Sequence, residues 1–218
     1  AQRANALHSP NAIMKSPLTL EQYLSARPIS EPFGLFDCVM PCAGAEGFLV
    51  MREEEAQRRG LTYARIASTI ERHNAFHEDP VQLRGGWVMD IDELYEMAGF
   101  GADAIDVLET YDDYPVISMM QFEDLGFCAK GEGAQFVRER DLTITGDFPH
   151  NTSGGQLSAG QAGAAGGYLG LVEAIRQVTG AAGGTQVAGA KTAMVSGFGM
   201  INYDRGLCSS AAILRGGG

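Results

Sequence analysis

The stretch 150-HNTSGGQLSAGQAGAAGG-167 is the most informative part of the sequence, and an apolar helical pattern from about residue 165 to 178 follows it directly. Its glycines allow backbone N–H groups to approach a ligand, and the helix that follows adds the positive end of its dipole. Composition alone equally allows a tight loop packed against a sheet. No lysine follows the glycines, so the stretch lacks the P-loop pattern for nucleotide phosphates.

Strand and helix patterns alternate on both sides of this stretch, which predicts an α/β fold. The last two predicted strands leave no room for a crossover helix, so they must pair antiparallel in a mixed sheet. The expected strands are residues 47–51, 63–70, 104–111, 186–195 and 207–214. The expected helices, apart from a short one near the N-terminus, are residues 53–59, 92–98, 116–125 and 165–178.

The N-terminal part is predicted to be a connector over residues 1–36, with one domain over residues 37–218. Ala1–Leu7 is helix-forming sequence without a cap before it, so we expect a further segment to precede it. Thr19 and Gln22 have the spacing of a capping box and predict a short helix that ends before Pro28.

Composition excludes several function classes. The 218 residues are 45% apolar, and 16 lysines and arginines against 27 acidic residues give a net charge of −11. A chain with this charge has no electrostatic means of holding a phosphate backbone, so nucleic acid is not an expected partner. No apolar run spans a bilayer and Ala1–Pro10 does not resemble a signal peptide, so we expect a cytoplasmic protein without a membrane segment.

The cysteines and histidines do not form a recognisable metal pattern. Cys38 and Cys42 lie four residues apart with no histidine nearby, and reduced structural thiols are the expected state of all four cysteines. His73 and His77 are also four apart, next to acidic residues, but a solvated loop explains them more simply. The sequence therefore predicts no metal site.

Asn151-Thr-Ser-Gly-Gly155 followed by Gly160-Gln161-Ala-Gly163 resembles the thiolase superfamily loop Asn-x-x-Gly-Gly…Gly-His-Pro-x-Gly. Residues 37–47 and 107–126 resemble two further segments of that superfamily, nearest its sterol-carrier-protein X type. The resemblance covers nearly the whole chain and implies the C-terminal thiolase-like half, a five-stranded mixed sheet with flanking helices. It also implies a homodimer and an N-terminal half that is absent from this chain.

The sequence departs from the thiolase pattern at the catalytic positions. Gln161 stands where the family has a histidine, and a carboxamide cannot accept and return a proton near neutral pH. Tyr111 aligns with the family's next catalytic position, an asparagine or histidine. Near the last two strands, either Tyr203 or Cys208 occupies the position of the family's reactive cysteine.

These departures resemble the thiolase-like steroid side-chain-cleaving aldolases. The resemblance implies a retro-aldol lyase that cleaves a β-hydroxyacyl-CoA to a steroid ketone and propionyl-CoA, with an OB-fold, zinc-ribbon protein as partner. It implies no cofactor, because CoA enters as part of the substrate. Two alternatives stay open: an acyl-CoA thiolase or acetyltransferase of the sterol-carrier-protein X type, and a noncatalytic scaffold.

The resemblance implies that Tyr111 and Tyr203 are catalytic, one acting on the hydroxyl and the other on the enolate carbon. A tyrosine with a pKa near 10 is about 3 units from ionising at neutral pH, roughly 4 kcal/mol, so Asp112 or Asp113 is expected to assist. Taken alone, Tyr111 is a packing residue at a strand end, and His150 is a structural hydrogen-bonding residue. The residues predicted to bind substrate are His150, Asn151, Gly155, Gly160 and Gln161.

Overall fold

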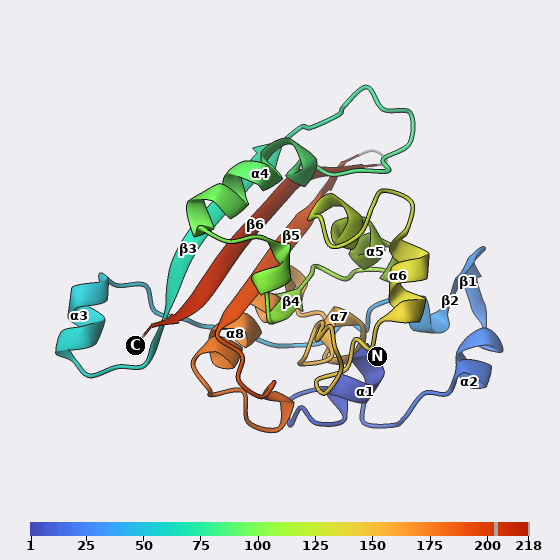
Figure 1. Cartoon of the computed structure of the whole chain (residues 1–218). Helices are drawn as coiled ribbons and strands as arrows, with labels where there is room; N and C mark the ends of the chain where they lie inside the picture. The colour runs from blue at the N-terminus through green and yellow to red at the C-terminus, as the bar shows by residue number, and fades with distance from the viewer. Residues whose placement is uncertain (203–204, 218) are drawn as a thin grey trace.

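The central sheet of the molecule has four strands in the order β3-β6-β5-β4 (Figure 1). The computed structural model describes residues 1–202 and 205–217. Strand β6 runs antiparallel to β3 and β5, whereas β4 and β5 are parallel, so the predicted mixed sheet is confirmed. The four strands are β3 (Tyr63–His73), β4 (Val107–Glu109), β5 (Thr192–Asn202) and β6 (Arg205–Gly217).

The expected strand at residues 47–51 is wrong, because these residues lie outside every described strand. Leu49 and Val50 are 86% and 77% exposed, so the apolar run has the composition of a buried strand but does not pair with the edge strand β3. Beyond β4, a single parallel bridge joins Leu108 to His150 and extends the sheet by one residue pair. A separate two-stranded ribbon pairs β1 (Pro28–Ser30) with β2 (Phe33–Gly34).

Most of the longer helices lie where the sequence predicts them. Helix α5 begins at Pro115, whose fixed φ and missing N–H suit the first helical position, and α4 ends at Gly99 in the left-handed region (φ 80°). The longer helices are α4 (Trp87–Ala98), α5 (Pro115–Asp124), α6 (Gly133–Glu139) and α8 (Gly166–Val178). None of the helices described is long and apolar enough to cross a bilayer.

The remaining helical segments are short. The predicted capping box is present at α2, where Gln22 N donates to Thr19 Oγ1 (3.2 Å) and Thr19 N donates to Gln22 Oε1 (2.9 Å). The short α-helices are α1 (Gln2–Ala6), α2 (Leu20–Leu24), α3 (Glu53–Arg58) and α7 (Gly155–Ser158). The 3₁₀ turns are Leu35–Asp37, Ala102–Ala104, Gly163–Ala165 and Gly183–Thr185.

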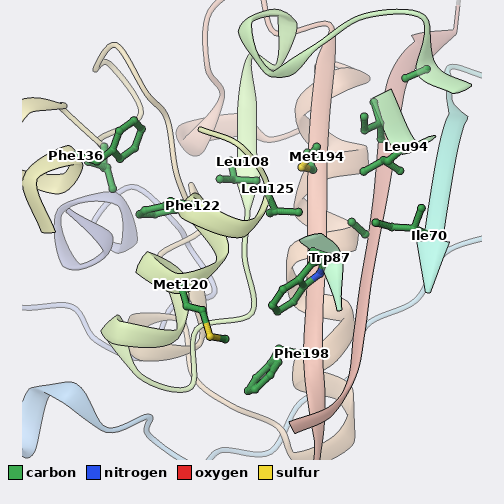
Figure 2. Packing of buried hydrophobic residues seen from close by; sticks show 14 residues of the cluster. Ile70, Trp87, Leu94, Leu108, Met120, Phe122, Leu125, Phe136, Met194 and Phe198 are labelled. Carbon is green, nitrogen blue, oxygen red and sulfur yellow. The ribbon is translucent and has the colours of Figure 1, made fainter. Parts of the chain in front are cut away.

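The two faces of the sheet carry separate hydrophobic clusters. Successive strand residues point to opposite faces, so Leu108 and Met194 join the cluster under α4 and α5, while their neighbours Val107 and Ala193 join the one under α8. Figure 2 shows the first cluster, in which Trp87 of α4 lies beside Phe198 of β5 with ring centroids 5.7 Å apart. The sheet is therefore covered on both faces, and its β4 end is fixed in place.

Candidate active site in the glycine-rich loop

The glycine-rich loop is joined directly to the end of β4. Asn151 N donates to Leu108 O (3.0 Å), and the Asn151 side chain both accepts from Thr110 N (2.8 Å) and donates to Thr110 O (3.2 Å). The backbone of Asn151 is in the left-handed region (φ 45°), which asparagine tolerates better than most residues, and its side chain is buried. Asn151 therefore acts as a clamp that sets the loop against residues 110–113.

Asp112 anchors the first turn of α7 from below. Its carboxylate accepts from Gln156 N (2.8 Å) and Leu157 N (3.3 Å), the orphan donors at a helix start, and from the Gln2 side chain (2.5 Å). Burial raises the pKa of Asp112 to about 7, although the backbone hydrogen bonds act in the opposite direction. Asp112 is 1% exposed, so it organises the loop and does not face a substrate.

Two predicted glycines in the loop are required by close approach as well as by backbone conformation. A Cβ on Gly155 (φ 60°) would lie 2.2 Å from Asp112 Oδ2, and a Cβ on Gly160 (φ 116°) would lie 2.8 Å from Cys42 Sγ. No other residue fits either position without displacing its neighbours. The loop therefore passes over Asp112 at a distance that only bare backbone allows.

A half-buried polar cluster lies on the other side of the same turn. Gln161 Nε2 donates to Asp113 Oδ1 (2.5 Å) and to Gln156 Oε1 (3.1 Å), and it lies 3.5 Å from the Tyr111 hydroxyl oxygen. Gln161 is held by its backbone, because Gln161 N donates to Met40 O (2.9 Å). We call Tyr111, Asp113, Gln156 and Gln161 the Tyr111 cluster. It unites the predicted Tyr111 and Gln161 with Asp113, one of the two aspartates expected to assist, and with Gln156, which is not predicted to be in the site.

The pKa shifts in the Tyr111 cluster favour a protonated Tyr111 beside the Asp113 carboxylate. Burial, followed by the negative charge of Asp113, raises the pKa of Tyr111 to about 12. Burial also raises the pKa of Asp113, while hydrogen bonds from Tyr111 and Gln161 lower it. A phenol with this pKa keeps its proton at neutral pH, so Tyr111 can pass a proton on but cannot act as a free phenolate base.

His150 lies in the core beneath the loop. Its ring is 3% exposed, packs edge-on against Phe122 with centroids 4.7 Å apart, and shares a 2.8 Å hydrogen bond between Nε2 and Thr110 Oγ1. Burial lowers the pKa of His150 to about 3, so the ring is neutral. This placement favours the structural alternative for His150 over contact with a substrate.

A buried acidic pair beside the loop is absent from the sequence prediction. The carboxyl groups of Glu109 and Glu173 both lie within hydrogen-bond distance of Thr152 Oγ1, at 2.7 and 2.9 Å. The Thr152 hydroxyl has one proton, so it can donate fully to only one of the two oxygens, and a proton on one carboxyl group would let that group donate in turn. Burial and then the charge of Glu173 raise the pKa of Glu109, which favours a proton on Glu109. A glutamate at the end of the three-residue buried strand β4 is the sequence signal that could have revealed the pair.

A large apolar groove lies apart from the Tyr111 cluster. Its volume is about 650 Å³, and it is lined by residues 47–51, the start of β3 and one side of α8. A smaller cavity of about 10 Å³, room for one water molecule, lies under the glycine-rich loop beside Tyr111, Asp112 and Gln156. The acid–base groups gather at the smaller cavity. The glycine-rich loop is therefore the candidate site, although the cavity beside it is much smaller than the apolar groove.

The remaining predicted catalytic residue, Tyr203, lies outside the described residues, so its role stays a prediction. Cys208 is described and half-buried on β6, where it pairs with His73 of β3 and Gly199 of β5. It is two strands away from β4, so Cys208 does not join the Tyr111 cluster.

Comparison with known proteins identifies the fold family. Residues 69–210, about two thirds of the chain, match the family described as Thiolase C-terminal domain-like. The chain belongs to this family. The resemblance that the loop motif predicts is therefore confirmed for the fold, with four sheet strands described where five are expected.

Three relatives narrow the comparison within this family. The chain is similar to the benzoylsuccinyl-CoA thiolase subunit BbsB of Thauera aromatica, at 28% identity over 85% of this chain and 49% of that protein. It is similar to the steroid side-chain-cleaving aldolase of Thermomonospora curvata, at 32% identity over 82% of this chain and 47% of that protein. The solved Ltp2-ChsH2(DUF35) aldolase superposes with a TM-score of 0.81 at 26% identity, over 99% of this chain and 56% of that one. The thiolase-like chain thus spans about half the length of the curated relatives it matches.

Proposed function

We propose that the protein is part of a retro-aldol carbon–carbon lyase that cleaves a β-hydroxyacyl-CoA, with a steroid side chain as substrate and a ketone and propionyl-CoA as products. The observation that carries the proposal is the Tyr111 cluster, in which a carboxamide, a phenol and a carboxylate meet beside the glycine-rich loop of a thiolase-like fold. Similarity to a steroid side-chain-cleaving aldolase and to a solved aldolase complex supports the same reaction.

The proposed first step uses Tyr111 as a proton relay. The phenol of Tyr111 takes the proton of the substrate β-hydroxyl while it passes its own proton to the Asp113 carboxylate. The electron pair of the O–H bond becomes the ketone C=O bond, and the Cα–Cβ bond breaks to leave an enolate on the thioester. A relay of this kind never needs a free phenolate, which the pKa of about 12 for Tyr111 disfavours.

The enolate then needs oxygen stabilisation and a proton on carbon. Gln161 Nε2 already donates to Asp113 and Gln156, so we assign Gln161 to positioning Asp113. The loop N–H groups of Gly155 and Gly160 are the proposed donors to the thioester oxygen, a role usually worth roughly 2.7–4 kcal/mol per donor. Tyr203 is the proposed acid that protonates the enolate carbon, which assigns the two tyrosine roles that the sequence leaves open.

The cofactor, the partner, the oligomeric state and the location of the protein are also part of the proposal. CoA is carried by the substrate and no further cofactor is required. An OB-fold, zinc-ribbon protein is the proposed partner, since the solved relative is an aldolase complex that includes a DUF35 component. We also propose a homodimer, completed by the N-terminal thiolase half, in the cytoplasm.

The test is cleavage of a β-hydroxyacyl-CoA that bears a tertiary alcohol, by the full-length protein with its partner. We expect ketone and propionyl-CoA to appear without free CoA, and Tyr111→Phe to lower turnover by about 1000-fold, roughly 4 kcal/mol, because the relay atom is lost. Tyr114→Phe is the matched control, since Tyr114 is 40% exposed and its ring packs on Phe33 with centroids 5.2 Å apart. Turnover of Tyr111→Phe within a few-fold of wild type would remove Tyr111 from the mechanism.

A thiolase or acetyltransferase is the second candidate, because the chain is also similar to a benzoylsuccinyl-CoA thiolase subunit. That reaction consumes free CoA and passes through an acyl-cysteine, whereas the lyase needs neither. Product formation that depends on added CoA would favour the thiolase. No turnover of the acyl-CoA, with or without free CoA, would favour the noncatalytic scaffold.

A further inference from the structure

Three potential metal ligands of different chemistry meet on one face of the β3–β6 pair. The ligand atoms of Glu71, His73 and Cys208 all lie within 4.8 Å of one another, with Cys208 Sγ 4.0 Å from His73 Nε2 and the Glu71 carboxylate in contact with the same nitrogen. The Glu71 and His73 side chains are 63% and 51% exposed. The group is therefore open to an ion from solvent.

Strand geometry brings the three side chains together. Glu71 and His73 are two residues apart, so they point to the same face of β3, and Cys208 lies directly opposite His73 on β6. Their strand neighbours point the other way, toward α4. Arg72 Nε donates to Asp90 Oδ2 of α4 (2.8 Å), and Ser209 Oγ accepts from Gly86 N just before α4 (2.8 Å).

The spacing suits a tetrahedral ion. Zinc bonds of about 2.0–2.3 Å place neighbouring ligand atoms roughly 3.5 Å apart, which small rotations of these exposed side chains would reach. One thiolate, one imidazole and one carboxylate are ligands that zinc accepts, and three protein ligands leave a fourth position for water. Cys208 lies two strand spacings and His73 three from the β4 end that carries Tyr111, roughly 10–14 Å across the sheet, so the group is separate from the Tyr111 cluster.

We propose that Glu71, His73 and Cys208 bind a divalent transition metal of the zinc type, with water as the fourth ligand. The site joins the edge strand β3 to β6. It lies near the Asn202–Arg205 pair at one end of the β5–β6 pairing. It departs from the sequence prediction of no metal site, and it pairs His73 with Cys208 and Glu71 where the sequence weighs His77. The His77 imidazole is 74% exposed and lies 3.8 Å from Glu78, outside this group.

The experiment is zinc titration of the reduced full-length protein, followed by calorimetry and, with cobalt in place of zinc, by visible and near-ultraviolet absorption. We expect one zinc per chain and a cobalt spectrum with a sulfur-to-metal charge-transfer band. His73→Gln and Cys208→Ser should each weaken binding by at least ~10–100-fold, the loss known for outer-shell partners alone, and Cys208→Ser should abolish the charge-transfer band. Glu71→Gln should weaken binding by about 10-fold.

Matched controls keep the result independent of folding and of the lyase proposal. His77→Gln and Cys128→Ser should leave zinc affinity unchanged, because neither side chain belongs to the group. Circular dichroism of each variant shows whether it is folded before titration, and no substrate is present. Equal zinc affinity of wild type, His73→Gln and Cys208→Ser, or a cobalt complex without a sulfur band, would overturn the proposal whether or not the lyase activity is found.

Discussion

Asp112 and Asp113 are adjacent in sequence, yet they belong to regions of opposite character. The Asp112 carboxylate lies buried under the glycine-rich loop, where backbone N–H groups hold it away from solvent. Asp113 points up into the half-buried Tyr111 cluster, where the partners are side chains. The difference shows how one turn after β4 can hold the loop rigid with one carboxylate and leave the next free to exchange a proton.

The buried hydrogen bonds of Asp112 should dominate stability, and Asp112→Ala is the most severe test of them. The change strands two buried backbone donors, each of which costs about 1–3 kcal/mol when unsatisfied, so we expect a loss of roughly 2–6 kcal/mol in the free energy of unfolding. Urea denaturation followed by circular dichroism measures it. Asp113→Ala is the control and should change stability by less than about 0.5 kcal/mol, as expected of a half-buried rim residue. Equal losses for the two variants would erase the distinction between the regions.

The Tyr111 cluster should dominate turnover, and Gln161→Ala tests it from the side of the positioning residue. We expect about a 100-fold fall in kcat, roughly 2.7 kcal/mol, with a nearly unchanged free energy of unfolding. The Gln161 hydrogen bond lowers the pKa of Asp113, so its loss should move the acidic limb of the pH–rate profile to higher pH. A fall in kcat without that movement would contradict the positioning role. Gln161→Asn should have a lower kcat than the wild type, because the shorter asparagine side chain does not reach Asp113 as well.

The buried Glu109–Glu173 pair should give the smallest and most specific effect, a change in how stability depends on pH. The folded state raises the pKa of Glu109 above its ordinary value of 4.5, so it binds a proton that the unfolded chain releases. Stability should therefore fall as the pH rises through the range above that value, by at most about 1.4 kcal/mol per pH unit for one proton. Glu109→Gln mimics the protonated form and should flatten this part of the curve.

Urea unfolding of wild type and Glu109→Gln at matched pH values checks this prediction. Asp112, whose pKa is also raised, contributes the same fall to both proteins and cancels in the comparison. Parallel curves for the two proteins would show that Glu109 is ionised in the folded state and that the Thr152 hydroxyl serves only one carboxylate.

The sequence predicts most of the fold because local patterns dominate where it succeeds. The capping box at Thr19, the proline at the start of α5 and the tight antiparallel pairing of β5 with β6 all depend on neighbours in the chain. The strand at residues 47–51 fails for the opposite reason. An apolar run predicts burial, but whether it pairs with a strand of the sheet depends on distant parts of the fold.

The candidate site is predictable in outline only. The glycines of the loop and the position of Tyr111 follow from motif spacing, and the structure brings Tyr111 and Gln161 together as that spacing suggests. The opposite orientations of Asp112 and Asp113, the pairing of Glu109 with Glu173, and the meeting of His73 with Cys208 depend on contacts between segments far apart in the chain. No periodicity or short motif encodes such contacts.

The first helix reaches further into the molecule than its five residues suggest. Asn5 is buried, and its amide donates to His150 O (2.9 Å) while its carbonyl oxygen accepts from Ile144 N (3.0 Å). Gln2 reaches Asp112 itself. Removal of residues 1–7 would therefore disturb the loop from beneath, and loss of activity in such a variant would say little about its chemistry.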